Sequence, residues 1–214
     1  MSSGAPTQNK IPLAAIVAGG KARRMGADKA VLLLEGVPLI ERVWARVATV
    51  SARLVTVGGV PRLGHLGVPT IQDFYTGADS LGGIATALRY ASAELGPRTA
   101  VLCVACDMPL LEPNLLLHLY RISCGWDVVV PRVEAGYEPL CAVYRVTCLP
   151  VMEGQIGRAN FAVRGIFRSV RTLEVKEEEL RGIDPDLLSF LNVNRPGDLD
   201  AAREALSQRS IRAV

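Results

Sequence analysis

Short apolar runs recur along the first two thirds of the chain, and most are bounded by Gly, Pro or Asp. They are rich in Val, Ile and Leu and show little alternation with polar residues. That pattern is typical of strands buried on both faces of a parallel sheet. We therefore expect strands over residues 13–17, 54–57, 68–71, 100–105 and 128–130.

Segments with helical spacing separate these runs. Apolar side chains recur three or four positions apart within residues 39–50, 81–95 and 115–122, as on the buried side of an amphipathic helix. Glu112-Pro113 places a proline at a first helical turn, which marks the start of the third helix. The alternation of strands and helices predicts an α/β fold, a three-layer α/β/α sandwich with a mainly parallel, Rossmann-like sheet.

The second half of the chain is less regular. We expect two further strands over residues 140–146 and 169–175. A last helix is expected to run to about Leu206, with Pro196 in its first turn, Asn194 as its cap and Asp198 near its positive end. Residues 11–208 are expected to form a single domain, with flexible tails at 1–10 and 209–214.

Composition narrows the class of protein. The chain has 214 residues, of which 50% are hydrophobic, enough for one sizeable core. The net charge of +3 comes without a Lys/Arg stripe, which argues against a nucleic-acid partner. No apolar run is long enough for a membrane span, and the first ten residues do not resemble a secretory leader. Five cysteines, an odd number, fit reduced thiols, so we expect a cytoplasmic protein.

Cysteine and histidine do not predict a metal or redox centre. Cys103 and Cys106 lie three apart on a predicted strand, where their side chains point to opposite faces and cannot share one ion. His65 and His118 are far apart and lack the ligand spacing of a zinc site. Buried thiols are the simpler interpretation of the cysteine pair.

A glycine-rich basic loop directly follows the first predicted strand. Gly19 and Gly20 allow backbone N–H groups to turn toward an anion, and Arg23, Arg24 and Lys29 add positive charge. The loop is neither a Walker A motif nor Gly-x-Gly-x-x-Gly. A strand-to-helix turn with solvated basic residues is the alternative. We favour a phosphate-binding loop.

An acidic residue follows the most apolar predicted strand. Asp107 comes directly after Cys106, at the carboxyl end of a strand, where open α/β sheets bind ligands. The alternative is a turn or capping aspartate before Pro109. Because the basic loop leaves its strand at the same edge, Asp107 is a candidate ligand for Mg²⁺ beside bound phosphates.

Several motifs together resemble one family. The loop, the segments 81–84, 106–111 and 138–140, and Asn192-Val193-Asn194 follow the order found in molybdenum cofactor guanylyltransferases, part of the wider nucleotidyltransferase group that also makes sugar nucleotides. The resemblance spans residues 12–206 and implies a nucleotide-diphospho-sugar transferase-like fold.

The resemblance also implies roles for particular residues. It implies that Lys29 contacts phosphate, that Asp107 binds Mg²⁺ and that Asp73 contacts guanosine. Asn192 and Asn194 match a pair that binds the pterin or organises the metal site. The full set of implied binding residues is Val17, Ala18, Gly19, Gly20, Arg23, Lys29, Asp73, Leu81, Gly82, Gly83, Asp107, Asn192 and Asn194.

The chain departs from the family pattern in three places. Val17 stands where Leu is commoner, and Gly58-Gly59 replace a frequent asparagine, which removes a side-chain contact to the nucleoside. Ser80-Leu81-Gly82-Gly83 stands where Pro-Leu-Ala-Gly is usual.

The implied reaction is transfer of GMP from GTP to the terminal phosphate of molybdopterin, with release of pyrophosphate. Lys29, Arg24 and Asp107 would carry it with Mg²⁺ by positioning and charge stabilisation. No general base is needed, because the nucleophile is already an anion. Which of Arg23 and Arg24 faces the triphosphate stays open. The resemblance allows transient contact with molybdoenzymes or other cofactor-biosynthesis proteins, and a monomer or small homo-oligomer.

Three alternatives remain at this stage. A CTP-dependent molybdopterin cytidylyltransferase shares the fold but tends to carry Ala-Ala-Gly where this chain has Ala18-Gly19-Gly20. A sugar-1-phosphate nucleotidyltransferase often has a longer chain. A non-catalytic GTP-binding module would keep the loop without releasing pyrophosphate.

Overall fold

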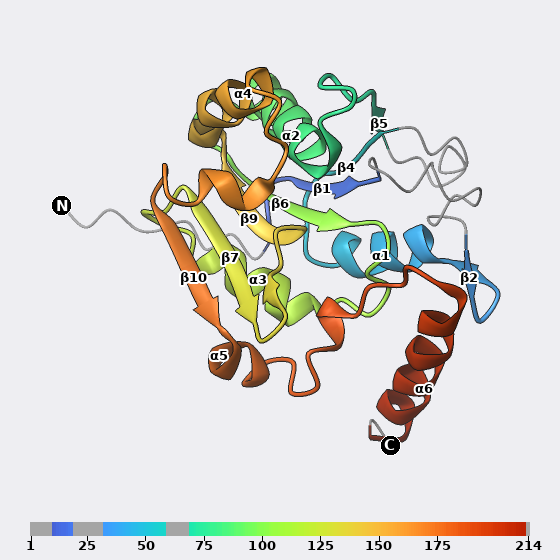
Figure 1. Cartoon of the computed structure of the whole chain (residues 1–214). Helices are drawn as coiled ribbons and strands as arrows, with labels where there is room; N and C mark the ends of the chain where they lie inside the picture. The colour runs from blue at the N-terminus through green and yellow to red at the C-terminus, as the bar shows by residue number, and fades with distance from the viewer. Residues whose placement is uncertain (1–9, 19–31, 59–68, 213–214) are drawn as a thin grey trace.

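The centre of the fold is a mixed, mostly parallel sheet (Figure 1). The computed structural model describes residues 10–18, 32–58 and 69–212. The strand order is β10-β7-β9-β6-β1-β4-β5, with β8 paired to β7. The strands are β1 (Ala14–Val17), β4 (Leu54–Val57), β5 (Thr70–Ile71), β6 (Ala100–Ala105), β7 (Val128–Val133), β8 (Gly136–Tyr137), β9 (Cys141–Arg145) and β10 (Thr172–Lys176).

Helices cover both faces of this sheet, which confirms the predicted three-layer sandwich. One face packs against α1 (Leu39–Ala48) and α3 (Pro113–Arg121). The other packs against α2 (Asp79–Leu95) and α4 (Leu149–Gly157). The remaining helical segments are α5 (Glu177–Arg181), α6 (Pro196–Arg212) and the 3-10 turns η4 (Val146–Cys148), η5 (Val163–Ile166) and η6 (Leu188–Phe190).

Strand β6 is buried along its whole length. Leu102 and Val104 belong to the core on the α1/α3 face, whereas Val101 and Cys103 belong to the core on the α2/α4 face. Full burial of an apolar side chain of this size contributes about 1.5–3 kcal/mol. The absence of polar alternation in this run therefore follows from its position in the middle layer.

Strands β8 and β9 are the exceptions to the parallel pattern, and β8 pairs antiparallel with β7. Strand β9 pairs antiparallel with both β6 and β7, so β6 and β7 run in the same direction. Residues 134–140 connect β7 to β9, and a parallel connection would need a longer crossover. Since β1 pairs parallel with β4 and β6, the carboxyl ends of β1, β4, β6 and β7 meet at one edge of the sheet.

The structure contains elements that the apolar pattern did not predict. A hairpin of β2 (Leu33–Leu34) and β3 (Val37–Pro38) turns through Glu35 and Gly36, with φ of 51° and 77°. Such a two-residue turn matches the twist of the strands that it joins. The hairpin lies beside α6 (Figure 1), and Leu34 shares a small apolar cluster with Ala202 of that helix. Helices α4 and α5 were also not predicted.

Element boundaries shift slightly from the predicted ones. Helix α3 begins at Pro113, with the Glu112 carboxylate accepting a hydrogen bond from the Asn114 N–H at 3.3 Å, which confirms the predicted start. Helix α6 extends to Arg212, beyond the expected end. Val68, the first residue of the third expected strand, lies outside the described residues. Within the described segments, no helix combines the length and apolar character needed to cross a membrane.

An ion pair holds the edge strand β10 to its neighbours. The Asp127 carboxylate, just before β7, accepts hydrogen bonds from the Arg171 guanidinium at 2.9 and 3.1 Å and from the Thr147 hydroxyl at 2.9 Å. The Arg171 backbone N–H also donates to it, at 3.1 Å. The Arg171 side chain contributes most to lowering the pKa of Asp127 to about 2.

Asp127→Asn is expected to lower the free energy of unfolding by about 1–2 kcal/mol at pH 7. Because the folded-state pKa lies below the ordinary value, the stabilisation is present above pH about 4 and declines as the pH falls toward 2. Urea unfolding at pH 7 and pH 3 measures it, with the exposed Asp200→Asn as control. An equal deficit at both pH values would contradict this account.

Candidate active site

The site lies at the edge of the sheet where β1 and β6 end. The Ala18 N–H donates to the Val57 carbonyl at 2.9 Å, and the Cys106 N–H donates to the Val17 carbonyl at 3.3 Å. These bonds continue the strand pairing one residue beyond β1 and β6. They place the start of the basic loop next to the residue preceding Asp107. Gly19, Gly20, Arg23, Arg24 and Lys29 lie outside the described residues.

Asp107 and the asparagine pair are brought together by the backbone. The Val193 N–H donates to the Asp107 carbonyl at 2.9 Å. Val193 is fully buried, so it anchors Asn192 and Asn194 on either side of it. Asp107 and Asn192 are half-buried, whereas Asn194 is exposed. Asp107 and Val193, which are 86 positions apart in the sequence, therefore meet at one point.

The start of α6 is held by Asp198. Its carboxylate accepts hydrogen bonds from the backbone N–H groups of Asn194 at 2.7 Å and Arg195 at 2.8 Å. A negative charge here is favourable next to the positive end of a helix. The residue therefore fixes the backbone that leads from Asn194 into α6.

Glu138 is a further acidic residue at this edge. It lies between β8 and β9 and is half-buried. Burial, and then the negative charge of Asp107, raise the pKa of Glu138 to about 7. Residues 138–140 contribute to the family resemblance, but the sequence predicted no role for this glutamate. The antiparallel direction of β9, which brings Glu138 to Asp107, could not be inferred from the apolar pattern.

Asp73 lies on the β5 side of the same edge. Its Oδ1 accepts hydrogen bonds from the Tyr75 N–H and the Thr86 hydroxyl, both at 3.0 Å. The Thr86 hydroxyl oxygen in turn accepts from the Phe74 N–H at 3.0 Å. Thr86 belongs to α2, so the helix fixes the orientation of the carboxylate. These hydrogen bonds hold Asp73 in the turn that follows β5.

Leu81, Gly82 and Gly83 are all buried in the first turns of α2. A Cβ on Gly82 would lie 2.7 Å from the Tyr75 carbonyl oxygen, and one on Gly83 would lie 2.5 Å from Val17 Cγ1. These glycines therefore let α2 approach both the Asp73 turn and β1. The Val17 side chain is buried against Gly83. Only the backbone of Val17 could therefore contact a ligand at the rim.

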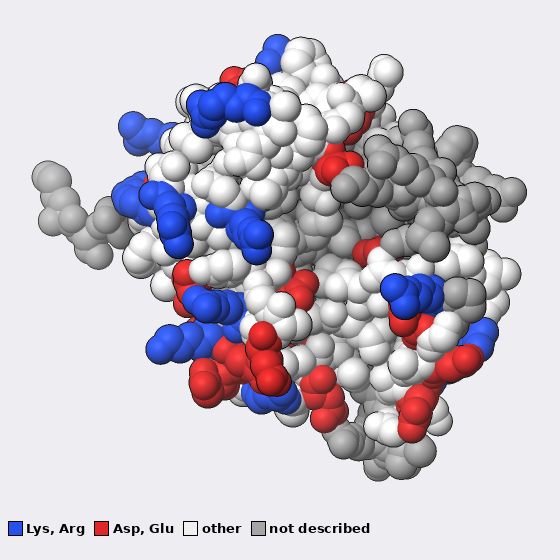
Figure 2. All heavy atoms as spheres, in the orientation of Figure 1, with Lys and Arg blue, Asp and Glu red and all other residues white. Residues whose placement is uncertain are grey.

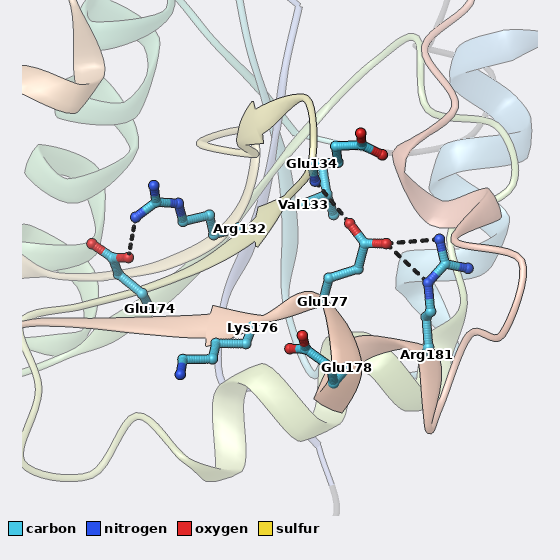
Figure 3. A pocket seen from close by; sticks show the side chains of 8 residues that line it. All are labelled: Arg132, Val133, Glu134, Glu174, Lys176, Glu177, Glu178 and Arg181. Atoms are coloured by element: carbon cyan, nitrogen blue, oxygen red, sulfur yellow. Dashed lines mark hydrogen bonds and ion pairs between the residues drawn. The ribbon is translucent and has the colours of Figure 1, made fainter.

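A cavity of about 580 Å³ lies beyond the ends of β7 and β10 (Figure 3). Arg132 pairs with Glu174 at 2.9 Å, and Arg181 pairs with Glu177 at 2.7 Å. The Glu177 carboxylate also accepts from the Glu134 N–H at 2.7 Å. Both arginines are thus already neutralised, which makes this cavity a poor anion site. None of its lining residues belongs to the predicted set.

Acidic side chains lie near the centre of the face drawn in Figure 2, and most of the Lys and Arg visible on that face lie to its left. In the described segments, no three His, Cys, Asp or Glu residues gather as ligands for one metal ion. Cys103 and Cys106 pack into the cores on opposite faces of the sheet, as predicted from strand geometry. His118 hydrogen-bonds with Glu179 at 2.8 Å.

The fold and this edge define a nucleotidyltransferase class. Residues 14–175 match the model of the MobA-like NTP transferase domain. The molybdenum cofactor guanylyltransferase of Desulfosudis oleivorans is 35% identical over 195 residues, covering 89% of this chain and 94% of that protein. The probable enzyme of the same name from Pelotomaculum thermopropionicum is 37% identical, covering 88% and 90%.

Comparison with solved structures supports the same family and the same fold. Molybdopterin-guanine dinucleotide biosynthesis protein A from Archaeoglobus fulgidus superposes with a TM-score of 0.77 at 29% identity, covering 92% of this chain and 99% of that one. The 2-C-methyl-D-erythritol 4-phosphate cytidylyltransferase of Thermus thermophilus, at 16% identity and a TM-score of 0.61, shares the fold. The chain belongs to the molybdenum cofactor guanylyltransferases, within the MobA-like NTP transferase family.

Gly83→Ala is expected to lower the free energy of unfolding by about 1–3 kcal/mol, because the new methyl group overlaps Val17. Val17→Ala removes the overlapping methyl groups, so the double variant should lose less stability than the sum of the single changes. Gly154→Ala in α4, with its nearest atom at 3.8 Å, is the control and should be neutral or stabilising. Strict additivity in denaturant unfolding would contradict the contact.

Proposed function

We propose that this enzyme transfers GMP from GTP to the terminal phosphate of molybdopterin and releases pyrophosphate. The observation that carries the proposal is the position of Asp107, two residues beyond β6 and beside the end of β1, where the basic loop begins. Asn192 and Asn194 are tied to the same point through Val193. The names of the curated relatives support guanine as the base.

Asp107 offers a carboxylate at the edge where phosphates are expected, and hard oxygen donors of this kind suit Mg²⁺. We assign Asp107 as the Mg²⁺ ligand. When bound, the ion neutralises charge on the phosphate oxygens. Asn192 and Asn194 serve the pterin or the organisation of the metal site, and Asp73 serves guanosine. Leu81, Gly82 and Gly83 act by shaping the backbone around the nucleotide.

The chemistry asks little of the protein beyond positioning. An oxygen of the molybdopterin phosphate forms a bond to the α-phosphorus of GTP, and the bond from that phosphorus to the β-bridging oxygen breaks. Its electron pair leaves with pyrophosphate. Lys29 and Arg24 stabilise the negative charge of the triphosphate and of the leaving group. The nucleophile is an anion already, so no side chain has to remove a proton.

The wider setting follows from the same assignment. We propose that residues 11–208 act as one nucleotidyltransferase domain, working in the cytoplasm as a monomer or small homo-oligomer. The substrates are small molecules, so neither a nucleic acid nor a membrane takes part. Transient contact with molybdoenzymes or other cofactor-biosynthesis proteins would deliver or receive the pterin.

Pyrophosphate release tests the proposal directly. The purified enzyme is incubated with Mg²⁺ and either GTP or CTP, with and without molybdopterin, and separately with sugar 1-phosphates. Release that requires both GTP and molybdopterin supports the proposal. Release that requires CTP and molybdopterin, and does not occur with GTP, would indicate a cytidylyltransferase. Release that requires a sugar 1-phosphate would indicate a sugar-1-phosphate nucleotidyltransferase. No release with bound GTP would indicate a binding module.

Asp107→Asn and Lys29→Ala are each expected to reduce turnover about 100-fold or more, because each removes a charge that we assign to phosphate or metal binding. Circular dichroism should show an intact fold, since Asp107 lies at the rim and not in the core. Lys176 is an exposed lysine that lines the cavity beyond β7 and β10. Lys176→Ala is the matched control and should keep full activity. Undiminished GTP-dependent product formation by Asp107→Asn would refute the metal assignment.

If Arg24 is the arginine that faces the triphosphate, Arg24→Ala is expected to weaken GTP binding more than Arg23→Ala, by about tenfold for one lost charge-assisted hydrogen bond. Fluorescence titration with a labelled GTP analogue measures both variants. Superimposable titration curves would show that the two arginines contribute equally.

A further inference from the structure

The pairing of β6 with β9 sets where Glu138 lies. Val104 of β6 is opposite Cys141 of β9, and the Ala105 N–H donates to the Leu140 carbonyl at 2.8 Å. Beyond this pair, Asp107 follows the end of β6 by two residues and Glu138 precedes the start of β9 by three. Because β6 and β9 are antiparallel, the two acidic residues lie at the same end of this strand pair, Asp107 after β6 and Glu138 before β9.

The backbone of Glu138 is fixed on both sides. Its N–H donates to the Pro131 carbonyl at 3.0 Å, and its carbonyl accepts from the Cys141 N–H at 3.1 Å. Its side chain is half-buried. Across the described segments, no residue donates a hydrogen bond to its carboxylate. A fixed, half-buried carboxylate close to a second one is stabilised by positive charge or by water hydrogens between them.

We propose that Glu138 is a positioning residue that accepts hydrogen bonds from the water ligands of the Mg²⁺ ion held by Asp107. The inference rests on the proposed function. Mg²⁺ usually keeps several of its waters when it is bound through one or two carboxylates. Those waters present hydrogens outward, and a second carboxylate that receives them orients the ion and strengthens its binding.

A pairing of Glu138 with a cation of the basic loop is the competing account. It makes a different prediction, because it would alter nucleotide binding even without metal. In the water-mediated arrangement, Glu138 contributes only when the divalent ion is present. Measuring the affinity for the divalent ion, and the affinity for nucleotide without metal, therefore distinguishes the water-mediated arrangement from pairing with the basic loop.

The experiment measures Mn²⁺ binding to the full chain complexed with α,β-methylene GTP, which cannot be transferred, by electron paramagnetic resonance of free Mn²⁺. Glu138→Gln and Glu138→Ala are compared with Asp107→Asn and with the wild type. Glu134→Gln, an exposed acid on the neighbouring turn, is the charge-matched control. Affinity for the analogue in EDTA is measured for each variant, and thermal unfolding verifies the fold.

Both Glu138 variants are expected to bind Mn²⁺ about 10–100-fold more weakly, with unchanged analogue affinity in EDTA. Glu134→Gln should match the wild type. Mn²⁺ affinity within twofold of wild type, or a change in the EDTA affinity instead, would overturn the inference. If the Glu138 variants give either of these results while the wild type forms the dinucleotide and Asp107→Asn loses Mn²⁺ binding, the inference about Glu138 fails and the proposed function stands. A wild type that forms no product and holds no Mn²⁺ contradicts the proposed function as well.

Discussion

The burial of β6 on both faces is the constraint on which the rest of the structure depends. A strand in the middle layer cannot carry a charged side chain without a large desolvation cost, so polar chemistry is confined to the residues beyond its end. Asp107 occupies the second such position. The parallel neighbour β1 and the antiparallel neighbour β9 then bring the start of the basic loop and Glu138 to the same place.

Much of the architecture could be predicted because the middle layer leaves a strong pattern in the sequence. The runs that became β4 and β6 were predicted to the residue, and the Glu112-Pro113 start of α3 is confirmed by its capping hydrogen bond. Asp107 was also singled out in the sequence, since an acid at the end of a fully apolar run is conspicuous, and its role as a metal ligand stays a prediction. These are local features, and local features can be read from one sequence.

The elements that were missed depend on interactions between distant segments. The β2–β3 hairpin is too short to show alternation, and its turn uses Glu35 at positive φ in place of the usual Asn or Gly. Helix α4 contains glycines and a proline, which obscure its helical pattern. The proximity of Glu138 to Asp107 depends on the direction of β9. Nothing within residues 138–145 specifies that direction, which follows from the short connection to β7.

The two halves of the site are joined by a single strand pair. The Asp73 turn and α2 are fixed to β1 through the close approach of Gly83 to Val17, whereas Val193 and Leu140 are fixed to the end of β6. The hydrogen bond between the Val17 carbonyl and the Cys106 N–H links both sets. In-line transfer between two bound phosphates requires their relative placement to be held closely, since small misplacement costs much of the rate. A site assembled on adjacent strands of a rigid sheet satisfies that requirement, and it explains why residues so far apart in the sequence converge on one edge.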